Sequence, residues 1–342
     1  MSPLPKIELH LHLEGALRPE TVREMSQVRL GRTGPLEVGW ERHYYTFTDF
    51  AGFMAQLTPR TPFRPDEYAR VARECFEDQA ARRAIYTEIS FEPPVTVVGD
   101  DTRFWPVVEA LEEERRRAEL RFPIRIGFIA GLMRTLPVEL AVYRVELAAQ
   151  ARDRGIGIAG IDLHGDEASG PPAEFLPAYR LAAECGLGLR AHAGEALGPE
   201  SVWEALDVLG ARRIGHGIRS VEDPELLSRL EQGDVTLEIC PTSNVRTATV
   251  TDLPSHPIRL LYDLGVPVTV SSDDPLPFFT DIERECRLLV DELGFGIDDL
   301  RRIGIYAARA AFVSAEERAT LAASIDQAYR TAAGEMTAAG PS

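Results

Sequence analysis

The feature that most constrains the fold is a series of short apolar segments, each followed by a loop and then by a helical pattern. Eight of these segments, rich in β-branched residues, are predicted strands, at residues 7–13, 84–91, 123–132, 157–163, 186–193, 213–218, 235–240 and 267–273. Strands that alternate with helices indicate βαβ units and a parallel sheet. Eight units in a chain of 342 residues favour a closed α/β barrel, the (β/α)8 TIM barrel, over an open sheet. The first strand is not followed by G-x-G-x-x-G, which argues against a dinucleotide-binding fold.

The interval between the first two predicted strands is much longer than the later intervals. We expect one barrel domain over residues 1–342, in which residues 19–83 add helices near the barrel mouth as a lid-like insertion. Within this insertion, Phe47, Phe50 and Met54 recur at helical spacing. Both ordinary core packing and an apolar wall over a substrate are compatible with that spacing.

Composition narrows the partners and the compartment. The net charge of −17 disfavours nucleic acid and anionic membranes, whose phosphates would be repelled. No run approaches the roughly 18 apolar residues of a membrane helix, and the first residues do not resemble a secretory signal. The four cysteines form no C-x-x-C pair, which fits a reducing compartment. We therefore expect a cytoplasmic protein that acts on a small molecule, while the oligomeric state stays open.

Two histidines lie in the first predicted strand, in the stretch KIELHLHLEGALRP. Alternation along a strand puts His10 and His12 on one face, and their neighbours Leu11 and Leu13 on the other. Two imidazoles on one face form a plausible platform for a divalent metal. Since H-x-H also occurs by chance, the pair alone leaves a partly buried structural strand as an alternative.

Other predicted strands also end in polar residues. The fifth leads into His192 and Glu195, the sixth into His216, and the eighth into Asp273 and Asp274. The fourth is followed by a polar group that is equally compatible with a solvated loop, His164, Gly165, Asp166 and Glu167. Active sites of such barrels form at the C-terminal ends of the strands. Four of the seven histidines are thus expected to meet there, namely His10, His12, His192 and His216. Three histidines and one carboxylate suit zinc with an open position for water.

Taken together and in this order, six motifs resemble the adenosine deaminase family of the amidohydrolase superfamily. They are HLHLEGALRP, GIDLHGDE, HAGE, RIGHG, CPTSN and SSDDPLPF, spread over residues 10–278. The segment DELGFGIDDLRRIGIYAARAAFVSAEER also resembles the family's C-terminal helices. The resemblance therefore extends over nearly the whole chain, and the ordered set is far more specific than any one motif.

The resemblance implies a set of roles. One zinc ion per chain would be held by four residues, His10, His12, His192 and Asp273. Glu195 would protonate the purine nitrogen next to the attacked carbon, and His216 would orient and deprotonate the zinc-bound water, beside Asp273. Asp274 and the backbone of Gly165 would contact the edges of the purine. Zinc lowers the pKa of bound water from 15.7 to about 7, and a positioned carboxylic acid makes the ring a better electrophile. We expect burial to raise the pKa of Glu195.

Two departures concern the substrate rather than the reaction. Family members that act on adenosine commonly have HLDG after the paired histidines, whereas this chain has Glu14. Their second strand usually reads Y-x-E-x-R-x-S-P, whereas YTEISFEPP places Ser90 and Glu92 there and is closer to the adenine-deaminase-like branch. We therefore expect zinc-dependent hydrolytic deamination of a 6-aminopurine nucleoside or base, of the adenosine-to-inosine type. The alternatives are adenine or a modified adenosine, such as aminodeoxyfutalosine, as substrate, and then a non-purine amidohydrolase or a non-catalytic binding protein.

Overall fold

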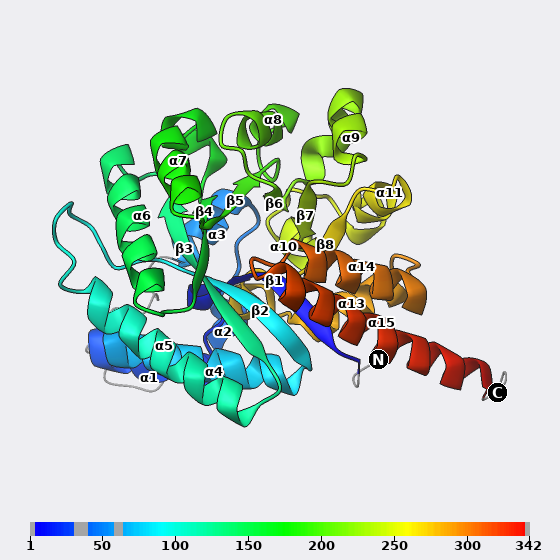
Figure 1. Ribbon diagram of the computed structural model, residues 1–342, viewed down its shortest axis with the longest axis horizontal. Coiled ribbons are helices and arrows are strands. Elements are labelled where there is room, and N and C mark those ends of the chain that lie inside the picture. The colour runs from blue at the N-terminus through cyan, green and yellow to red at the C-terminus, as the bar shows by residue number, and fades with distance from the viewer. Residues whose placement is uncertain (1–3, 31–39, 58–63, 339–342) are drawn as a thin grey trace.

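The computed structural model describes residues 4–30, 40–57 and 64–338. Its centre is a barrel of eight parallel strands in sequential order (Figure 1). The strands are β1 (Lys6–His12), β2 (Ala84–Phe91), β3 (Arg125–Met133), β4 (Ile158–His164), β5 (Gly188–Ala193), β6 (Arg213–His216), β7 (Thr236–Ile239) and β8 (Val268–Val270). Each overlaps one of the eight predicted strands, so the predicted (β/α)8 barrel is confirmed.

The barrel is closed by backbone contacts between β1 and the segment that follows β8. The His12 amide donates to the Asp273 carbonyl at 2.9 Å, and the Asp273 amide donates to the His10 carbonyl at 3.0 Å. Strand β8 itself ends at Val270, so the contacts that close the barrel are made by residues that follow this strand. The two predicted metal ligands on β1 are thus held directly beside the acidic pair.

Helices cover the outside of the barrel and connect successive strands (Figure 1). They are α5 (Phe104–Arg121), α6 (Val138–Asp153), α7 (Leu176–Glu184), α8 (Pro199–Asp207), α9 (Pro224–Leu230), α10 (Pro241–Arg246) and α11 (Ile258–Asp263). After β8 follow α12 (Pro275–Phe278), α13 (Ile282–Asp291), α14 (Ile297–Ala310) and α15 (Ala315–Ala338). Their apolar faces and the apolar strand residues form a continuous buried core.

The expected helical insertion after β1 is present. It contains α1 (Pro19–Leu30), α2 (Trp40–Tyr44), α3 (Phe50–Leu57) and α4 (Pro65–Ala81), within the predicted interval 19–83. Helix α4 packs against α5, and the two lie with α1 at one side of the barrel (Figure 1). Residues 31–39 and 58–63 of the predicted insertion lie outside the described residues.

The barrel interior holds charged side chains as well as apolar ones. Arg190 on β5 contacts Asp162 on β4 at 2.8 Å and Glu238 on β7 at 3.4 Å, and all three are fully buried. Alternation places Asp162 and Arg190 one layer below the residues two positions further along each strand, His164 and His192. An ionic layer therefore lies directly beneath the histidines at the barrel mouth.

The described residues contain neither a membrane-spanning helix nor a disulfide. Among these, no helix is both long and apolar enough to cross a membrane. The four cysteines are free thiols.

Candidate active site

A cavity of about 250 Å³ opens at the C-terminal ends of the strands, where the sequence predicted the site. Strands β1, β4, β5 and β6, the segment after β8 and helix α3 all contribute to its walls. Its lining residues are His12, Glu14, Phe50, Phe53, Met54, Glu92, Met133, His164, Gly165, His192, Glu195, His216, Asp273 and Asp274. Most of the predicted substrate and catalytic residues therefore share one cavity.

Three donor atoms form a nearly equilateral triangle beside this cavity. His10 Nε2 lies 3.3 Å from His12 Nε2 and 3.3 Å from Asp273 Oδ1, and His12 Nε2 lies 3.4 Å from the same oxygen. Ligands at 2.0–2.1 Å from a tetrahedral metal are separated by about 3.3–3.4 Å, which is the spacing of this triangle. The triangle therefore fits a tetrahedral metal ion of zinc's size.

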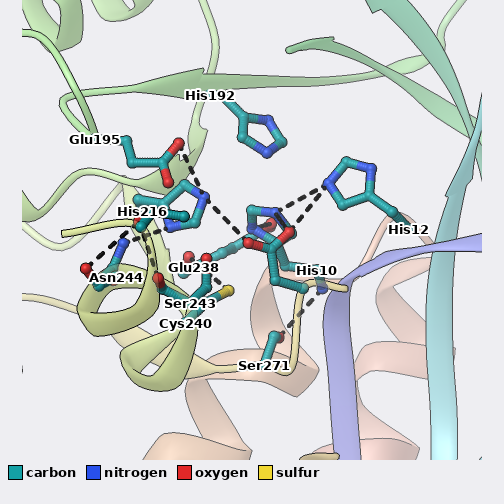
Figure 2. A network of polar contacts seen from close by, with 12 residues as sticks. His10, His12, His192, Glu195, His216, Glu238, Cys240, Ser243, Asn244 and Ser271 are labelled. Atoms are coloured by element: carbon teal, nitrogen blue, oxygen red, sulfur yellow. Dashed lines mark hydrogen bonds and ion pairs between the residues drawn. The ribbon is translucent and has the colours of Figure 1, made fainter. Parts of the chain in front are cut away.

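Further imidazoles complete the cluster. His192 and His216 offer nitrogen atoms within 4.8 Å of ligand atoms of His10 and Asp273. The His10 and His192 rings lie 4.5 Å apart between centroids (Figure 2). Burial lowers the pKa of His10 well below its usual value and that of His12 to about 3, so both stay neutral, as metal ligands must. These four histidines and Asp273 form one cluster at the barrel mouth, in which a metal ion can be held.

The ionic layer below orients one of these histidines. His192 Nδ1 lies 3.1 Å from the Asp162 carboxylate, so it donates its proton there and leaves Nε2 free for a metal. Although burial opposes ionisation, the Arg190 guanidinium and His192 hold the pKa of Asp162 well below its usual range. Sequence analysis did not assign Asp162 a role, although it lies inside the GIDLHGDE motif.

Glu195 follows strand β5 and lies at the edge of the metal cluster. Its Oε2 is 3.5 Å from His216 Nε2, and a dashed line joins the two side chains in Figure 2. Burial, then the charges of Asp273 and Glu167, raise the pKa of Glu195 well above its usual range. The predicted rise, and burial as its main cause, are confirmed, so this carboxyl group is available as a proton donor near neutral pH.

Glu167 anchors the loop that carries Glu195. Its Oε1 accepts hydrogen bonds from Gly194 N at 2.8 Å and Ser201 Oγ at 2.6 Å. Its Oε2 accepts three more backbone bonds at 2.6–3.1 Å, from the amides of residues 195, 196 and 197. Sequence analysis allowed a solvated loop here, whereas Glu167 is buried and holds five donors.

A chain of hydrogen bonds determines which nitrogen of His216 carries a proton. The Ile258 amide can only donate, so His256 Nδ1, 3.1 Å away, accepts, and the proton of that neutral ring lies on Nε2. His256 Nε2 donates to Asn244 Oδ1 at 3.3 Å, and Asn244 Nδ2 then donates to His216 Nδ1 at 3.1 Å. Burial lowers the pKa of both histidines to about 4, so both are neutral. His216 therefore presents an Nε2–H group to the cavity.

The acidic pair after β8 is buried and constrained. Asp273 adopts a left-handed backbone (φ 64°), an uncommon conformation for a residue other than glycine that recurs at active sites. Burial, and then the neighbouring Asp273 charge, raise the pKa of Asp274 well above its usual range. Asp274 Oδ1 is buried with no hydrogen-bond partner among the described residues. A Cβ at Gly15 would lie 1.8 Å from this oxygen, so the glycine makes room for Asp274.

Helix α3 covers the cavity with apolar side chains. Phe50, Phe53 and Met54 line it, whereas the sequence left both core packing and an apolar wall open for Phe50 and Met54. Phe47 instead packs against Phe53 at 5.4 Å and Phe278 at 5.9 Å between ring centroids, and is not among the lining residues. Phe47 precedes helix α3, which begins at Phe50, so helical spacing alone could not separate these two positions.

Comparison with known proteins decides the family. The family model described as adenosine deaminase matches residues 5–328. The chain belongs to the adenosine deaminase family. It is accordingly a hydrolase that acts on carbon–nitrogen bonds.

Relatives within the adenosine deaminase family differ in substrate. An aminodeoxyfutalosine deaminase of Streptomyces avermitilis is 35% identical over 94% of this chain and 90% of its own length. An adenine deaminase of Rhizobium etli is 37% identical over 94% of this chain and 99% of its own length. The solved structure of an amidohydrolase from Burkholderia ambifaria, with bound zinc, has a TM-score of 0.86 and 27% identity, and covers 98% and 93% of the two chains. Family membership therefore specifies an aminopurine deaminase without selecting the purine.

Proposed function

We propose that this protein hydrolyses the 6-amino group of a purine base or nucleoside, with zinc, to give the 6-oxopurine and ammonia. The observation that carries the proposal is the triangle of metal-binding atoms directly beside the buried, protonated Glu195. A metal site and a carboxylic acid in one cavity are what hydrolytic attack on an aromatic amidine requires.

The donor set supports zinc as the metal. Imidazoles and one carboxylate are ligands that zinc accepts, and the zinc-containing structure of the related amidohydrolase agrees. In this proposal one zinc ion is held by four residues, His10, His12, His192 and Asp273. When bound, zinc supplies Lewis acidity, which makes water a nucleophile at neutral pH.

Glu195 acts as the acid in this proposal. Because its pKa is raised, it carries a proton that it donates to purine N1, next to the attacked C6. Protonation withdraws electrons from C6 and prepares it for attack.

In this proposal His216 orients the attacking water and Asp273 accepts its proton. The Nε2–H group of His216 donates a hydrogen bond to the attacking oxygen, and Nε2 lies 3.8 Å from Asp273 Oδ2. The sequence resemblance gave deprotonation to His216, but the hydrogen-bond chain through Asn244 supports Asp273 Oδ2 as the proton acceptor. Asp273 then passes this proton to the amino nitrogen, the C6–N bond breaks, and ammonia leaves. The remaining C6 hydroxyl proton restores Glu195.

Two groups bind the purine edges in this proposal. The Gly165 amide donates to N3, and Asp274, protonated because its pKa is raised, donates to N7. Asp274 Oδ1, buried without a partner among the described residues, supports this role, since a bound ligand would satisfy it.

The test measures ammonia release by the zinc-loaded protein from adenine, adenosine, deoxyadenosine, 5′-modified adenosines and N6-substituted purines. We expect turnover of at least one of them, and a loss of about 10³-fold or more in E195Q with zinc retained. Glu200→Gln makes the same change at an exposed position on α8 and is expected to leave turnover unchanged. No ammonia from any 6-aminopurine, or a fully active E195Q, would contradict the proposal.

A further inference from the structure

Three side chains form a belt across one side of the cavity. We use "the belt" for Glu14, Glu92 and His164, which come from the ends of β1, β2 and β4 and all line the cavity. Glu92 stands in the middle: its amide donates to Glu14 Oε1 at 2.9 Å, and its Oε1 contacts His164 Nε2. The ends of three strands are therefore joined at this side of the cavity, by one backbone to side-chain hydrogen bond and one contact between side chains.

The belt is fixed from outside by a buried cation. Arg144 Nη1 donates to Glu92 Oε2 at 2.8 Å and to the Gly131 carbonyl at 3.2 Å, and Nη2 donates to the Val95 carbonyl at 3.0 Å. Arg144 is only 5% exposed, so a movement of Glu92 away from it would leave a buried guanidinium without its charged partner, at a high cost in free energy. The position of Glu92 is therefore set by a strong buried pair.

Neighbouring residues leave space for the belt and support it. At Gly131 a Cβ would lie 2.5 Å from Glu92 Oε1 and 2.8 Å from His164 Nε2, so the glycine leaves room for the contact between Glu92 and His164. The Tyr68 hydroxyl donates to the Glu92 carbonyl at 3.2 Å and lies 3.4 Å from Glu14 Oε1. The His164 ring stacks on His12, with centroids 5.3 Å apart and planes within 4°. These contacts define the belt's shape on all sides.

The ends of the belt locate it relative to a bound purine. His164 precedes Gly165, which contacts N3 in the proposed function, and Glu14 precedes Gly15, which packs against Asp274, the residue proposed for N7. Around the rim of a purine, N9 lies between N3 and N7, opposite N1 and C6. The belt therefore faces N9, the atom that carries the sugar in a nucleoside.

We propose that the belt makes this enzyme selective for the free 6-aminopurine base, with hydrogen rather than a sugar on N9. This inference rests on the proposed function and names its substrate class. The Glu14 carboxyl group accepts the N9 hydrogen, while Glu92 and His164 fill the space through which a sugar would leave the ring. Phe50, Phe53 and Met54 of α3 line the same cavity with apolar groups.

The test compares adenine, 9-methyladenine and adenosine as substrates of the zinc-loaded wild-type protein. The methyl group removes the N9 hydrogen and adds little else, so it isolates the contact. A site built to bind an N–H rejects the analogue that lacks it strongly, so we expect kcat/KM for adenine to exceed both others by at least about 100-fold. Equal or faster turnover of 9-methyladenine or adenosine would overturn the inference.

Variants then assign selectivity to the belt. His164→Ala opens the side facing N9 without touching Arg144, and we expect the adenine to 9-methyladenine ratio of kcat/KM to fall at least about 10-fold with zinc retained. Glu174→Ala, at an exposed position shortly after β4, is expected to leave the ratio unchanged. Should His164→Ala fail to fold, Glu14→Gln, of nearly equal size, is expected to lower the same ratio. Its oxygen stays with the Glu92 amide, so its NH2 group would face the N9 hydrogen as a second donor. An unchanged ratio in the folded variant would refute the role of the belt.

Failure of the proposed function is a different result, namely no ammonia from any aminopurine.

Discussion

Replacement of Glu167 by glutamine is the sharpest test of how the acid is positioned. In the wild type, one buried carboxylate accepts five hydrogen bonds, four of them from consecutive amides of residues 194–197. E167Q keeps the size of the side chain but replaces one oxygen by an NH2 group. The five donors then face a single acceptor oxygen and a competing donor.

The geometry allows the cost to be worked out. The best arrangement of the glutamine keeps its oxygen at the Oε2 position, because three amides converge there and the Ser201 hydroxyl near Oε1 can rotate to accept. The Gly194 amide then loses its acceptor, which costs about 1–3 kcal/mol, and three bonds to a charged group become neutral, at about 1 kcal/mol each. Since adjacent losses are not additive, we expect a loss of about 4 kcal/mol in the free energy of unfolding, a large part of a typical total.

The effect on catalysis follows from the position of Glu195 in the same loop. A displacement of about 1 Å costs roughly 10²-fold in rate, so kcat is expected to fall about 100-fold with zinc content unchanged. Loss of the Glu167 charge also removes a cause that raises the pKa of Glu195, so the alkaline limb of the kcat/KM profile should move to lower pH.

The assays are urea unfolding, zinc analysis and ammonia release across pH, with the exposed Glu174→Gln variant as the matched control. The reasoning is refuted if E167Q unfolds at the wild-type urea concentration and keeps wild-type kcat. A stable variant with lost zinc would also refute it, because the carboxylate would then act on the metal site rather than on the loop.

Three further outcomes are expected. Asp162→Asn weakens the acceptor that orients His192 and should lower zinc affinity about 10–100-fold by competition with a chelator; unchanged affinity would contradict this. Asn244→Leu breaks the chain that sets the proton on His216 and should lower kcat about 10-fold or more at unchanged KM in steady-state assays; a change confined to KM would contradict this. Buried Glu285 has a pKa of about 7, raised by burial, so the folded state binds its proton more tightly and stability falls as pH rises above the unfolded value near 4.5. Between pH 5 and 8 the free energy of unfolding, measured by urea titration, should fall by about 2–3 kcal/mol more for the wild type than for Glu285→Gln. The same pH dependence in both proteins would contradict this prediction.

Local pattern was sufficient to predict the barrel and the position of the site. Each predicted strand overlaps an observed one, since apolar β-branched runs between helices leave few alternative arrangements. Polar residues at the strand ends could then be placed in one region without coordinates, because parallel strands bring their C-terminal ends together. The insertion shows the limit of this reasoning. Phe47 and Phe50 belong to the same pattern of helical spacing, but only Phe50 lines the cavity.

The sequence by itself determined the fold class and placed the histidines and carboxylates of several strand ends in one region, since both depend on residue type and on position along a strand. The roles of the metal ligands and of Glu195 followed only from the resemblance to the family. Only the tertiary structure decided how these groups are held. Glu167 reaches the Glu195 loop, and Glu92 reaches His164, across 28 and 72 positions of the chain. Such contacts depend on which side chains barrel closure brings within about 3 Å of one another, and no local period encodes that distance.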